Sequence, residues 1–357
     1  MRIDSPPFTR EVVHPEEGVL GWLCVDSWVD GLAFGGCRMT PDVTRDEVEE
    51  LARCMTLKLA AHGSPTGGAK AGIRMDPKAS DAAEKLAYFA QSLSDLLKGG
   101  VVLGKDMGAT DKAIDGMYAA IDSPQLAPLV TSPCTRLRDF KGYRRHMTGL
   151  GVAFATRAAM GGQLKGVRVA IQGAGLVGLG SALRLQSLGA EIVAMSDVER
   201  ALYWREGVDV TQLEEAIAAS RSLKELSQGE PMARDDLFAL EVDVVVLAAS
   251  SYSVSRDHVS LMKAPRIVEG CNMGFSKGAR ELAQERGIEV VPDVLASSSS
   301  AAMVCRQIAA GGRLDETALW RAIEEAIEAR VGAAQRHARQ QGITLREAHI
   351  RWAQSER

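Results

Sequence analysis

The sequence lacks the features that mark several classes of protein. Its six cysteines form no CxxC pair, and its six histidines do not have the spacing of metal ligands. A zinc site and a disulfide framework are therefore not expected, and scattered cysteines are typical of reduced thiols in the cytoplasm. Apolar runs stay well short of the roughly 20 residues that a membrane span needs. The polar start "MRIDSPPFTREVV" has no apolar signal-peptide core, so we expect a cytoplasmic protein.

Neither sign of charge is in large excess. The chain carries 42 Lys and Arg against 46 Asp and Glu, which gives a net charge of -4 at pH 7. This balance gives no electrostatic reason to expect a nucleic acid or an anionic membrane as partner. A hydrophobic content of 46% and a charged content of 25% are those of an ordinary globular protein. A length of 357 residues predicts two domains.

Short apolar segments alternate with helical segments in the second half of the chain. They are "GVRVAIQGAG", "AEIVAMSD", "VDVVVLAA", "RIVEGCN" and "IEVVPD". This alternation predicts an α/β domain, with a parallel sheet that has helices on both faces. The preceding stretch from Pro124 to Arg145 is rich in Pro, Ser, Thr and Arg and is the expected linker.

A glycine-rich turn follows the first of these strands. In "VRVAIQGAGLVGLGSALRL", Gly173, Gly175 and Gly178 form a GxGxxG pattern that opens a helix, with Leu176 and Val177 inside it. Such a turn lets backbone approach a pyrophosphate at the helix N-terminus. Asp197 ends the next strand and favours NAD by accepting hydrogen bonds from a ribose. Two alternatives stay open: the turn binds nothing, or Asp197 caps the following segment. Because Arg200 lies nearby, NADP also stays open as the cofactor.

A lysine lies on the apolar stripe of a predicted helix in the first half. Thr44 and Glu47 have the spacing of a capping box, so the helix begins near Arg45. Lys58 falls on the stripe, where burial costs desolvation unless an anion meets it. The alternative is a lysine that snorkels at the helix end. The other members of the stripe are Val48, Leu51, Ala52, Met55 and Leu59.

A second lysine follows a glycine pair. Gly67 and Gly68 let backbone approach closely just before Lys70. Two cations near one glycine-lined surface repel each other, which lowers the pKa of at least one lysine and makes it a candidate general base. Asp106 follows a short apolar run, where a carboxylate either serves the same chemistry or simply caps the next helix.

Six ordered motifs resemble those of the glutamate/leucine/phenylalanine/valine dehydrogenase family, and the resemblance covers nearly the whole chain. They are "GGCRM" from Gly35, "MTLKLAAHGSPTGGAK", "GKDMGAT", "MTGLGV" from Met147, "EGCN" from Glu269 and "RGIEVVPDVLAS". The resemblance implies reversible, NAD(P)-dependent oxidative deamination of an L-amino acid to a 2-oxo acid. It also implies a homo-oligomer.

The resemblance further implies a fold and roles. A cleft would separate a substrate and oligomerisation domain, residues 1–140 with 330–357, from a Rossmann dinucleotide-binding domain, residues 141–329. Lys58 would bind the substrate α-carboxylate, Lys70 would activate water, and Asp106 would shuttle protons at the amine. Further contacts to the cofactor are implied at three positions, Thr148, Ala248 and Asn272. No metal is expected.

The substrate side chain is the point at which this sequence differs from glutamate-specific members. Those members carry a lysine where Phe34 stands, and a serine at the position that matches Val304. A buried glutamate carboxylate would be left unpaired here, at a cost of several kcal/mol. Small residues at Gly104 and Ala301, with Gly36 near them, resemble the leucine and phenylalanine type. We therefore predict an apolar or aromatic amino acid as substrate and glutamate as a poor one.

The segment Ser297–Ser300 replaces the family's Asn-Ala-Gly-Gly. Serine also donates and accepts hydrogen bonds but is shorter than asparagine. This departure leaves two further hypotheses open, an enzyme for an unusual substrate of specialised metabolism and an inactive nucleotide-binding regulatory protein. The joint presence of Lys58, Lys70 and Asp106 argues against the second, because an inactive site has no need for two lysines that repel each other.

Overall fold

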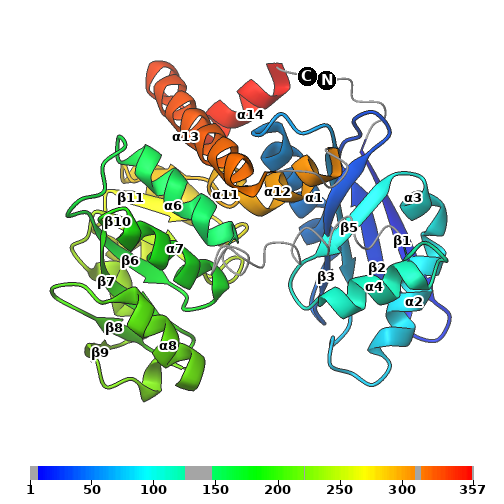
Figure 1. Ribbon diagram of the computed structural model, residues 1–357, viewed down its shortest axis with the longest axis horizontal. Helices are drawn as coiled ribbons and strands as arrows, with labels where there is room; N and C mark the ends of the chain where they lie inside the picture. The colour runs from blue at the N-terminus through cyan, green and yellow to red at the C-terminus, as the bar shows by residue number, and fades with distance from the viewer. Residues whose placement is uncertain (1–6, 125–146, 221, 310–314, 356–357) are drawn as a thin grey trace. The chain divides into compact units, whose positions relative to one another are not determined.

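A computed structural model describes residues 7–124, 147–220, 222–309 and 315–355. The chain divides into two compact units, each with its own sheet (Figure 1). The first unit comprises Met1–Asp139, Ala301–Trp320 and Trp352–Arg357, and the second comprises Phe140–Ser300 and Arg321–Arg351. The expected linker lies, beyond Pro124, outside the described residues.

The first unit has a five-stranded mixed sheet in the order β1-β2-β4-β3-β5. β4 runs antiparallel to β2 and parallel to β3, and β3 is also parallel to β5. The strands are β1 (Phe8–His14), β2 (Gly18–Val25), β3 (Ala33–Met39), β4 (Gly67–Ile73) and β5 (Val101–Lys105). The helices are α1 (Arg45–Ala60), α2 (Ala82–Ser92), α3 (Ser94–Lys98) and α4 (Asp111–Ala119).

α1 begins where the sequence predicted and packs closely on β4. The Thr44 side chain accepts a hydrogen bond from the Glu47 N–H at 3.3 Å, which is one half of the expected capping box. A Cβ on Gly68 would lie 2.3 Å from Thr56 Oγ1, and one on Gly72 would lie 2.4 Å from Val48 Cγ2. The glycines of β4 therefore let α1 cover the face of the sheet that also carries Lys70, because alternate residues of a strand share a face.

The second unit has a seven-stranded sheet in the order β12-β11-β10-β6-β7-β8-β9. The strands are β6 (Arg168–Gln172), β7 (Glu191–Ser196), β8 (Ala201–Tyr203), β9 (Glu230–Met232), β10 (Val244–Leu247), β11 (Arg266–Glu269) and β12 (Glu289–Val291). β12, β11, β10, β6 and β7 are parallel, whereas β8 and β9 add antiparallel pairs. From β6 the chain moves to β7 on one side and later to β10 and β11 on the other.

The helices of the second unit follow from this strand order. Right-handed crossovers in opposite directions place helices on both faces, so the sheet is doubly wound as predicted. The helices are α6 (Met147–Ala159), α7 (Leu176–Ser187), α8 (Val210–Ser220), α9 (Arg256–Leu261), α10 (Ala279–Glu285) and α11 (Asp293–Ala296), with short 3-10 turns η3 (Leu223–Glu225) and η4 (Arg234–Ala239). α12 (Ser299–Ala309), α13 (Glu316–Gln341) and α14 (Leu345–Ser355) complete the chain.

The C-terminal helices differ from the expected domain ranges. Residues 330–357 were expected with the first domain, but residues 321–351 group with the second unit. The reason is a set of polar contacts. Gln335 Nε2 donates to Ala159 O at 3.3 Å and to Glu289 Oε1 at 2.9 Å, and Arg346 pairs with Asp293. Only residues 352–357 group with the first unit.

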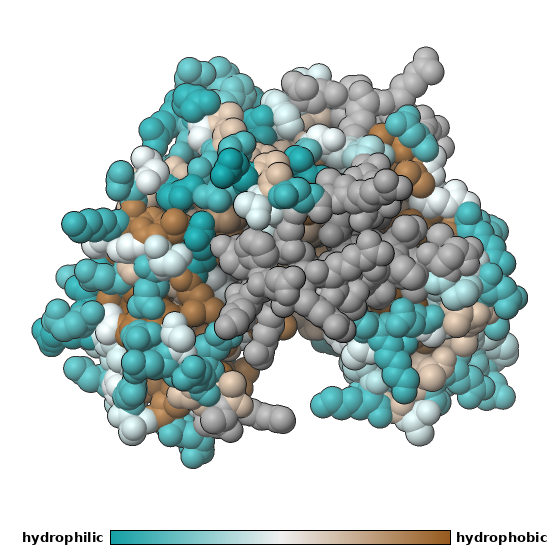
Figure 2. Space-filling view, in the orientation of Figure 1, coloured by the Kyte–Doolittle hydropathy of each residue, from teal (hydrophilic) through white to brown (hydrophobic). Residues whose placement is uncertain are grey.

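The surface matches the composition. Figure 2 shows hydrophilic residues over much of the visible face of the second unit, with apolar residues between them. Within the described part of the chain, no helix has both the length and the apolar character needed to cross a membrane.

Candidate active site

Three charged side chains meet on the face of the first sheet that α1 covers. Lys70 comes from β4, Arg38 from β3, and Asp106 follows β5. Lys70 Nζ lies 3.0 Å from Asp106 Oδ1, and Arg38 Nε lies 2.8 Å from Asp106 Oδ2. Arg38 also pairs with Glu47 in the first turn of α1. Because Lys70 and Arg38 are only 3% and 4% exposed, these pairs lie largely out of water.

Burial and neighbouring charges shift the pKa values of this cluster in a direction that suits proton transfer. Burial lowers the pKa of Lys70, and the charges of Arg38 and Lys58 lower it further, while Asp106 opposes them. Burial acts to raise the pKa of Asp106, but Lys70 and Arg38 outweigh it and hold that pKa below its usual range. Asp106 is therefore ionised, and Lys70 loses its proton more readily than an exposed lysine.

Lys58 lies inside the unit rather than at its surface. It is 6% exposed, so the alternative of a lysine snorkelling into solvent does not hold. Its charge lowers the pKa of the Lys70 amine, so the two lysines interact electrostatically.

Gly36 leaves room beside this cluster. A Cβ at Gly36 would lie 3.0 Å from Asp106 Cβ and 3.3 Å from Lys70 Nζ. Both distances are shorter than ordinary van der Waals contact. The missing side chain therefore keeps open the space next to the two groups that would handle protons.

An apolar surface continues from Gly36 along β3 and β5. The register pairs Phe34 with Val102 and Gly36 with Gly104, so these four residues share one face of the sheet. Phe34 and Val102 are buried, and Ala301 of α12 belongs to the same hydrophobic cluster. The structure thus brings together four predicted substrate-site residues, Phe34, Gly36, Gly104 and Ala301. Another, Val304, lies in α12, but its side chain is outside the described part of the structure.

The glycine pattern forms the predicted turn between β6 and α7 in the second unit. Gly173 has φ +105°, and a Cβ on Gly178 would lie 1.8 Å from Gly173 O, so both positions need glycine. Gly175 is the N-cap of α7, has no side-chain cap, and faces open space. An exposed helix N-terminus over a glycine turn is a cradle for a pyrophosphate.

Exposed apolar side chains surround this cradle. Among the described residues, six large apolar side chains are exposed, and three of them follow adjacent parallel strands. Leu176 follows β6, Val198 follows β7 and Tyr252 follows β10, with exposures of 51%, 87% and 45%. Adjacent parallel strands end at one edge of the sheet, where dinucleotides bind. Apolar surfaces beside an anion cradle fit the flat rings and the pyrophosphate of a nicotinamide dinucleotide.

Asp197 takes the role that the sequence left open as the alternative. Its Oδ1 accepts hydrogen bonds from the N–H groups of Glu199 and Arg200 at 2.8 and 3.0 Å. Its Oδ2 accepts from Leu223 N–H at 2.7 Å and from Ser222 Oγ at 3.2 Å. A carboxylate offers about four acceptor positions, and all are used here. Asp197 thus caps the segment that follows it.

The other predicted cofactor contacts lie at the ends of elements in the second unit. Thr148 lies in the first turn of α6 and donates from Oγ1 to Ser300 Oγ at 3.3 Å. Ala248 follows β10, and its N–H donates to Gln172 O at 2.7 Å. Asn272 lies partly buried in the loop after β11.

Hydroxyl groups of Ser297–Ser300 are engaged within the second unit. Ser297 and Ser298 donate to carbonyls of α11, Asp293 O at 2.9 Å and Leu295 O at 2.7 Å. Ser299 donates to Met147 O at 2.7 Å, across to α6. These contacts make the serine segment a structural junction between α11, α12 and α6.

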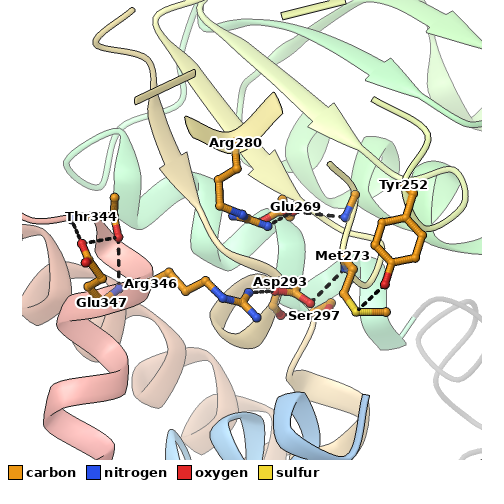
Figure 3. Close-up of polar contacts among 10 residues, drawn as sticks. Tyr252, Glu269, Met273, Arg280, Asp293, Ser297, Thr344, Arg346 and Glu347 are labelled. Carbon is orange, nitrogen blue, oxygen red and sulfur yellow. Dashed lines mark hydrogen bonds and ion pairs between the residues drawn. The ribbon is translucent and has the colours of Figure 1, made fainter. Parts of the chain in front are cut away.

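Sequence reasoning missed two buried carboxylates that hold the loop after β11 (Figure 3). Arg280 pairs with Glu269 through two 2.7 Å hydrogen bonds, and Arg346 pairs with Asp293 at 2.6 Å. The same carboxylates accept from Gly274 N–H and Met273 N–H, each at 3.2 Å. Both acids stand in the motifs "EGCN" and "VVPD", but motif matching gave them no role. Arg38, the arginine of "GGCRM", was missed in the same way.

The fold and site define a class of protein. A buried lysine–aspartate pair in one unit and a dinucleotide turn in the other are the parts of a nicotinamide-dependent oxidoreductase. The chain belongs to the Glutamate/Leucine/Phenylalanine/Valine dehydrogenase family, whose model matches residues 142–353. Residues 11–123 match the Glu/Leu/Phe/Val dehydrogenase dimerisation domain. The protein is an amino acid dehydrogenase. Its relatives include both NADP-specific and NAD-specific enzymes.

Individual relatives agree with the family assignment. The chain is 30% identical to the NADP-specific glutamate dehydrogenase of Saccharolobus shibatae over 289 residues, 78% of this chain and 68% of the relative. It is 33% identical to an NAD-specific glutamate dehydrogenase of Staphylococcus aureus over 282 residues, 75% and 67% of the two chains.

Solved structures have the same fold. The hetero-hexameric glutamate dehydrogenase of Thermus thermophilus, in a leucine-bound form, matches with a TM-score of 0.80 and 28% identity over 99% of this chain and 88% of its own. The L-tryptophan dehydrogenase of Nostoc punctiforme matches in fold, with a TM-score of 0.69 and 19% identity over 98% and 94% of the two chains.

Proposed function

We propose that the protein reversibly deaminates an apolar or aromatic L-amino acid to its 2-oxo acid. The observation that carries this proposal is the apolar face of Phe34, Val102 and Gly104 beside the Lys70–Asp106 pair. An aliphatic or aromatic side chain that packs on this face loses water without leaving a polar group unpaired. In this proposal the first unit binds substrate and the second binds the dinucleotide.

The residues of the first unit divide the work of binding and proton transfer. Lys58, buried on α1, binds the α-carboxylate through its positive charge. Asp106 is ionised and accepts a proton from the substrate ammonium group, leaving the amine neutral. When bound, the nicotinamide supplies the acceptor for the hydride from the substrate Cα.

Lys70 then acts as the general base. Its lowered pKa lets Lys70 give up its proton more readily than an exposed lysine, and the amine then takes a proton from the water that attacks the Cα carbon of the iminium. Asp106 returns its proton to the nitrogen and is ionised again. As the C–N bond breaks, Asp106 takes the proton of the new hydroxyl group, so that ammonia leaves and the carbonyl forms. Gly36 leaves the space in which the carbon and the water meet these groups.

Glutamate is the substrate named for several relatives, and it is the competing candidate. Its side-chain carboxylate would face Phe34 rather than a cation. An unpaired buried carboxylate costs several kcal/mol, which is sufficient to reject glutamate by about a hundredfold or more. The apolar face therefore supports an apolar or aromatic substrate over glutamate.

A panel of L-amino acids tests this proposal. We expect kcat/KM for leucine, phenylalanine or tryptophan to exceed that for glutamate by about a hundredfold or more, measured as NADH formation. Phe34→Leu should keep this preference, whereas Phe34→Lys should reduce it. Comparable values for glutamate and for the apolar amino acids would contradict the proposal. Calorimetric NAD binding without turnover on any amino acid would favour an inactive, regulatory protein.

We also propose a homo-oligomer in the cytoplasm. The matched N-terminal family model is described as a dimerisation domain, and the Thermus thermophilus relative is hetero-hexameric. Four described cysteines, Cys24, Cys37, Cys54 and Cys271, form no disulfide, which supports a reducing compartment. Sedimentation velocity of the purified protein tests the assembly.

A further inference from the structure

We propose that Arg38 is a positioning residue for the reaction, acting through Asp106 and held from its other side by Glu47. This inference rests on the proposed roles of Lys70 and Asp106. It adds a residue to the site and assigns to α1 a part in holding the reacting carboxylate.

The geometry gives each oxygen of Asp106 a separate partner. Arg38 Nε donates a hydrogen bond to Oδ2 at 2.8 Å, and Lys70 Nζ forms an ion pair with Oδ1 at 3.0 Å. Glu47 fixes the other end of the guanidinium. A planar guanidinium that is held at two points sets the plane of the carboxylate that it binds, so Oδ1 stays directed at Lys70.

Arg38 itself does not transfer a proton in the reaction. Burial opposes its charge, but Asp106 and Glu47 outweigh this effect and raise the pKa of Arg38. A guanidinium that never loses its proton can only donate hydrogen bonds. The protons of the reaction therefore pass through Oδ1 of Asp106, and Oδ2 remains committed to Arg38.

The charge of Arg38 also acts on Lys70. The charged groups around the Lys70 amine are the cations Arg38 and Lys58 and the anion Asp106, with Glu47 behind Arg38. Two thiols lie close by, Cys37 on β3 and Cys24 opposite Lys70 on β2, and burial raises their pKa values to about 12 and about 11, so both stay neutral. Removal of Arg38 deletes one cation and leaves Asp106 to Lys70 alone, and both changes raise the pKa of Lys70.

The pH profile of kcat/KM tests the proposal. In Arg38→Met the acid limb should move to higher pH, so that kcat/KM at a pH on that limb falls about tenfold beyond any uniform loss. Arg38→Lys keeps the charge but not the planar fork, so its limb should stay in place while kcat falls. Glu47→Gln removes an anion from behind Arg38 and should move the limb slightly in the opposite direction.

A second variant controls for misfolding of Arg38→Met. Arg38→Met leaves Glu47 without its arginine, so the double variant Arg38→Met with Glu47→Gln removes both charges of that pair at once. Circular dichroism and thermal melting confirm the fold of each variant. The double variant should still show the alkaline shift, because Lys70 has lost the same neighbouring cation.

A measurement without turnover separates this proposal from the proposed function. Trace labelling of the Lys70 amine by acetic anhydride, followed by mass spectrometry across pH, reports its ionisation with no substrate present. The same alkaline shift is expected in Arg38→Met and in the double variant. Folded variants whose labelling curve and acid limb coincide with the wild type would overturn the role of Arg38. A preference for glutamate would overturn only the proposed substrate, since the profile can be measured with whichever amino acid reacts.

Discussion

At the scale of single residues, Gly36 affects the site through the side chain that it lacks. Its strand neighbours on the same face, Phe34 and Arg38, both carry large side chains. A methyl group at position 36 would contact Lys70 Nζ at 3.3 Å, Asp106 Cβ at 3.0 Å and Lys105 O at 2.9 Å. One of these atoms is backbone, so the neighbourhood cannot fully relax around it.

Gly36→Ala should therefore reduce activity far more than stability. We expect kcat/KM to fall about a hundredfold, because displacement of reacting groups by a fraction of an ångström removes productive geometry. Gly116→Ala is the matched control. Gly116 lies inside α4, and a Cβ there would meet nothing within 4 Å. Alanine at that position should stabilise the protein by about 0.5–1 kcal/mol and leave kcat/KM unchanged. Equal kinetic effects of the two substitutions would contradict the role of Gly36.

At the scale of elements, Asp197 joins the end of β7 to the turn η3. Its four hydrogen bonds reach forward as far as Leu223, although the family pattern places it as a ribose ligand. The same carboxylate cannot accept two ribose hydroxyl groups without releasing these donors. Asp197 thus directly holds the connection between β7 and η3.

Asp197→Asn tests which partner matters. An amide offers fewer acceptor sites and adds two donors, so it should loosen the β7–η3 connection and lower the thermal midpoint. We expect kcat/KM for NAD and for NADP to change in parallel, with their ratio shifting less than about tenfold. Ser222→Ala, which removes one of the four hydrogen bonds, is the control and should cost about 1 kcal/mol. A selective loss of NAD activity in Asp197→Asn would instead identify the carboxylate as a ribose ligand.

The elements also show what a sequence can and cannot predict. Local signals were sufficient for α1, whose cap and apolar stripe lie within 16 residues, and for the glycine turn before α7. Lys58, Lys70 and Asp106 could be assigned to one site from the sequence because each stands in a family motif. The partners of Asp197 and Asp293 were not predictable, since Leu223 and Arg346 lie 26 and 53 residues away. No local pattern states which of many arginines will pair with a given carboxylate.

At the scale of the whole molecule, the path of the C-terminal helices was the main surprise. An amphipathic pattern indicates that a helix buries one face, but it does not indicate which domain that face packs against. Residues 321–351 are held by ion pairs of Arg157 with Glu324 and Glu328, and of Arg346 with Asp293. These long-range pairs join the last helices to the second unit.

Arg346→Ala measures how strongly the end of the chain supports the second unit. Asp293 is fully buried, so loss of its arginine should destabilise the protein by about 3 kcal/mol. Weaker NAD binding should accompany this, because Asp293 also holds the Met273 N–H in the loop with Asn272. Arg339→Ala is the control, since that side chain is 70% exposed and 3.8 Å from Glu289, and its loss should cost less than about 1 kcal/mol. Thermal unfolding and calorimetry with NAD distinguish the two. Indistinguishable variants would show that the Arg346–Asp293 pair is not a support.

The pairing of Arg38 with Glu47 has a consequence for motion. Glu47 lies in the opening turn of α1, the part of any helix most prone to fray. When that turn opens, the guanidinium loses one of its two anchors and holds the plane of the Asp106 carboxylate less firmly. The rigidity of the reaction centre is thus limited by how often the first turn of α1 opens. Slow amide exchange in residues 45–48 should therefore accompany efficient turnover.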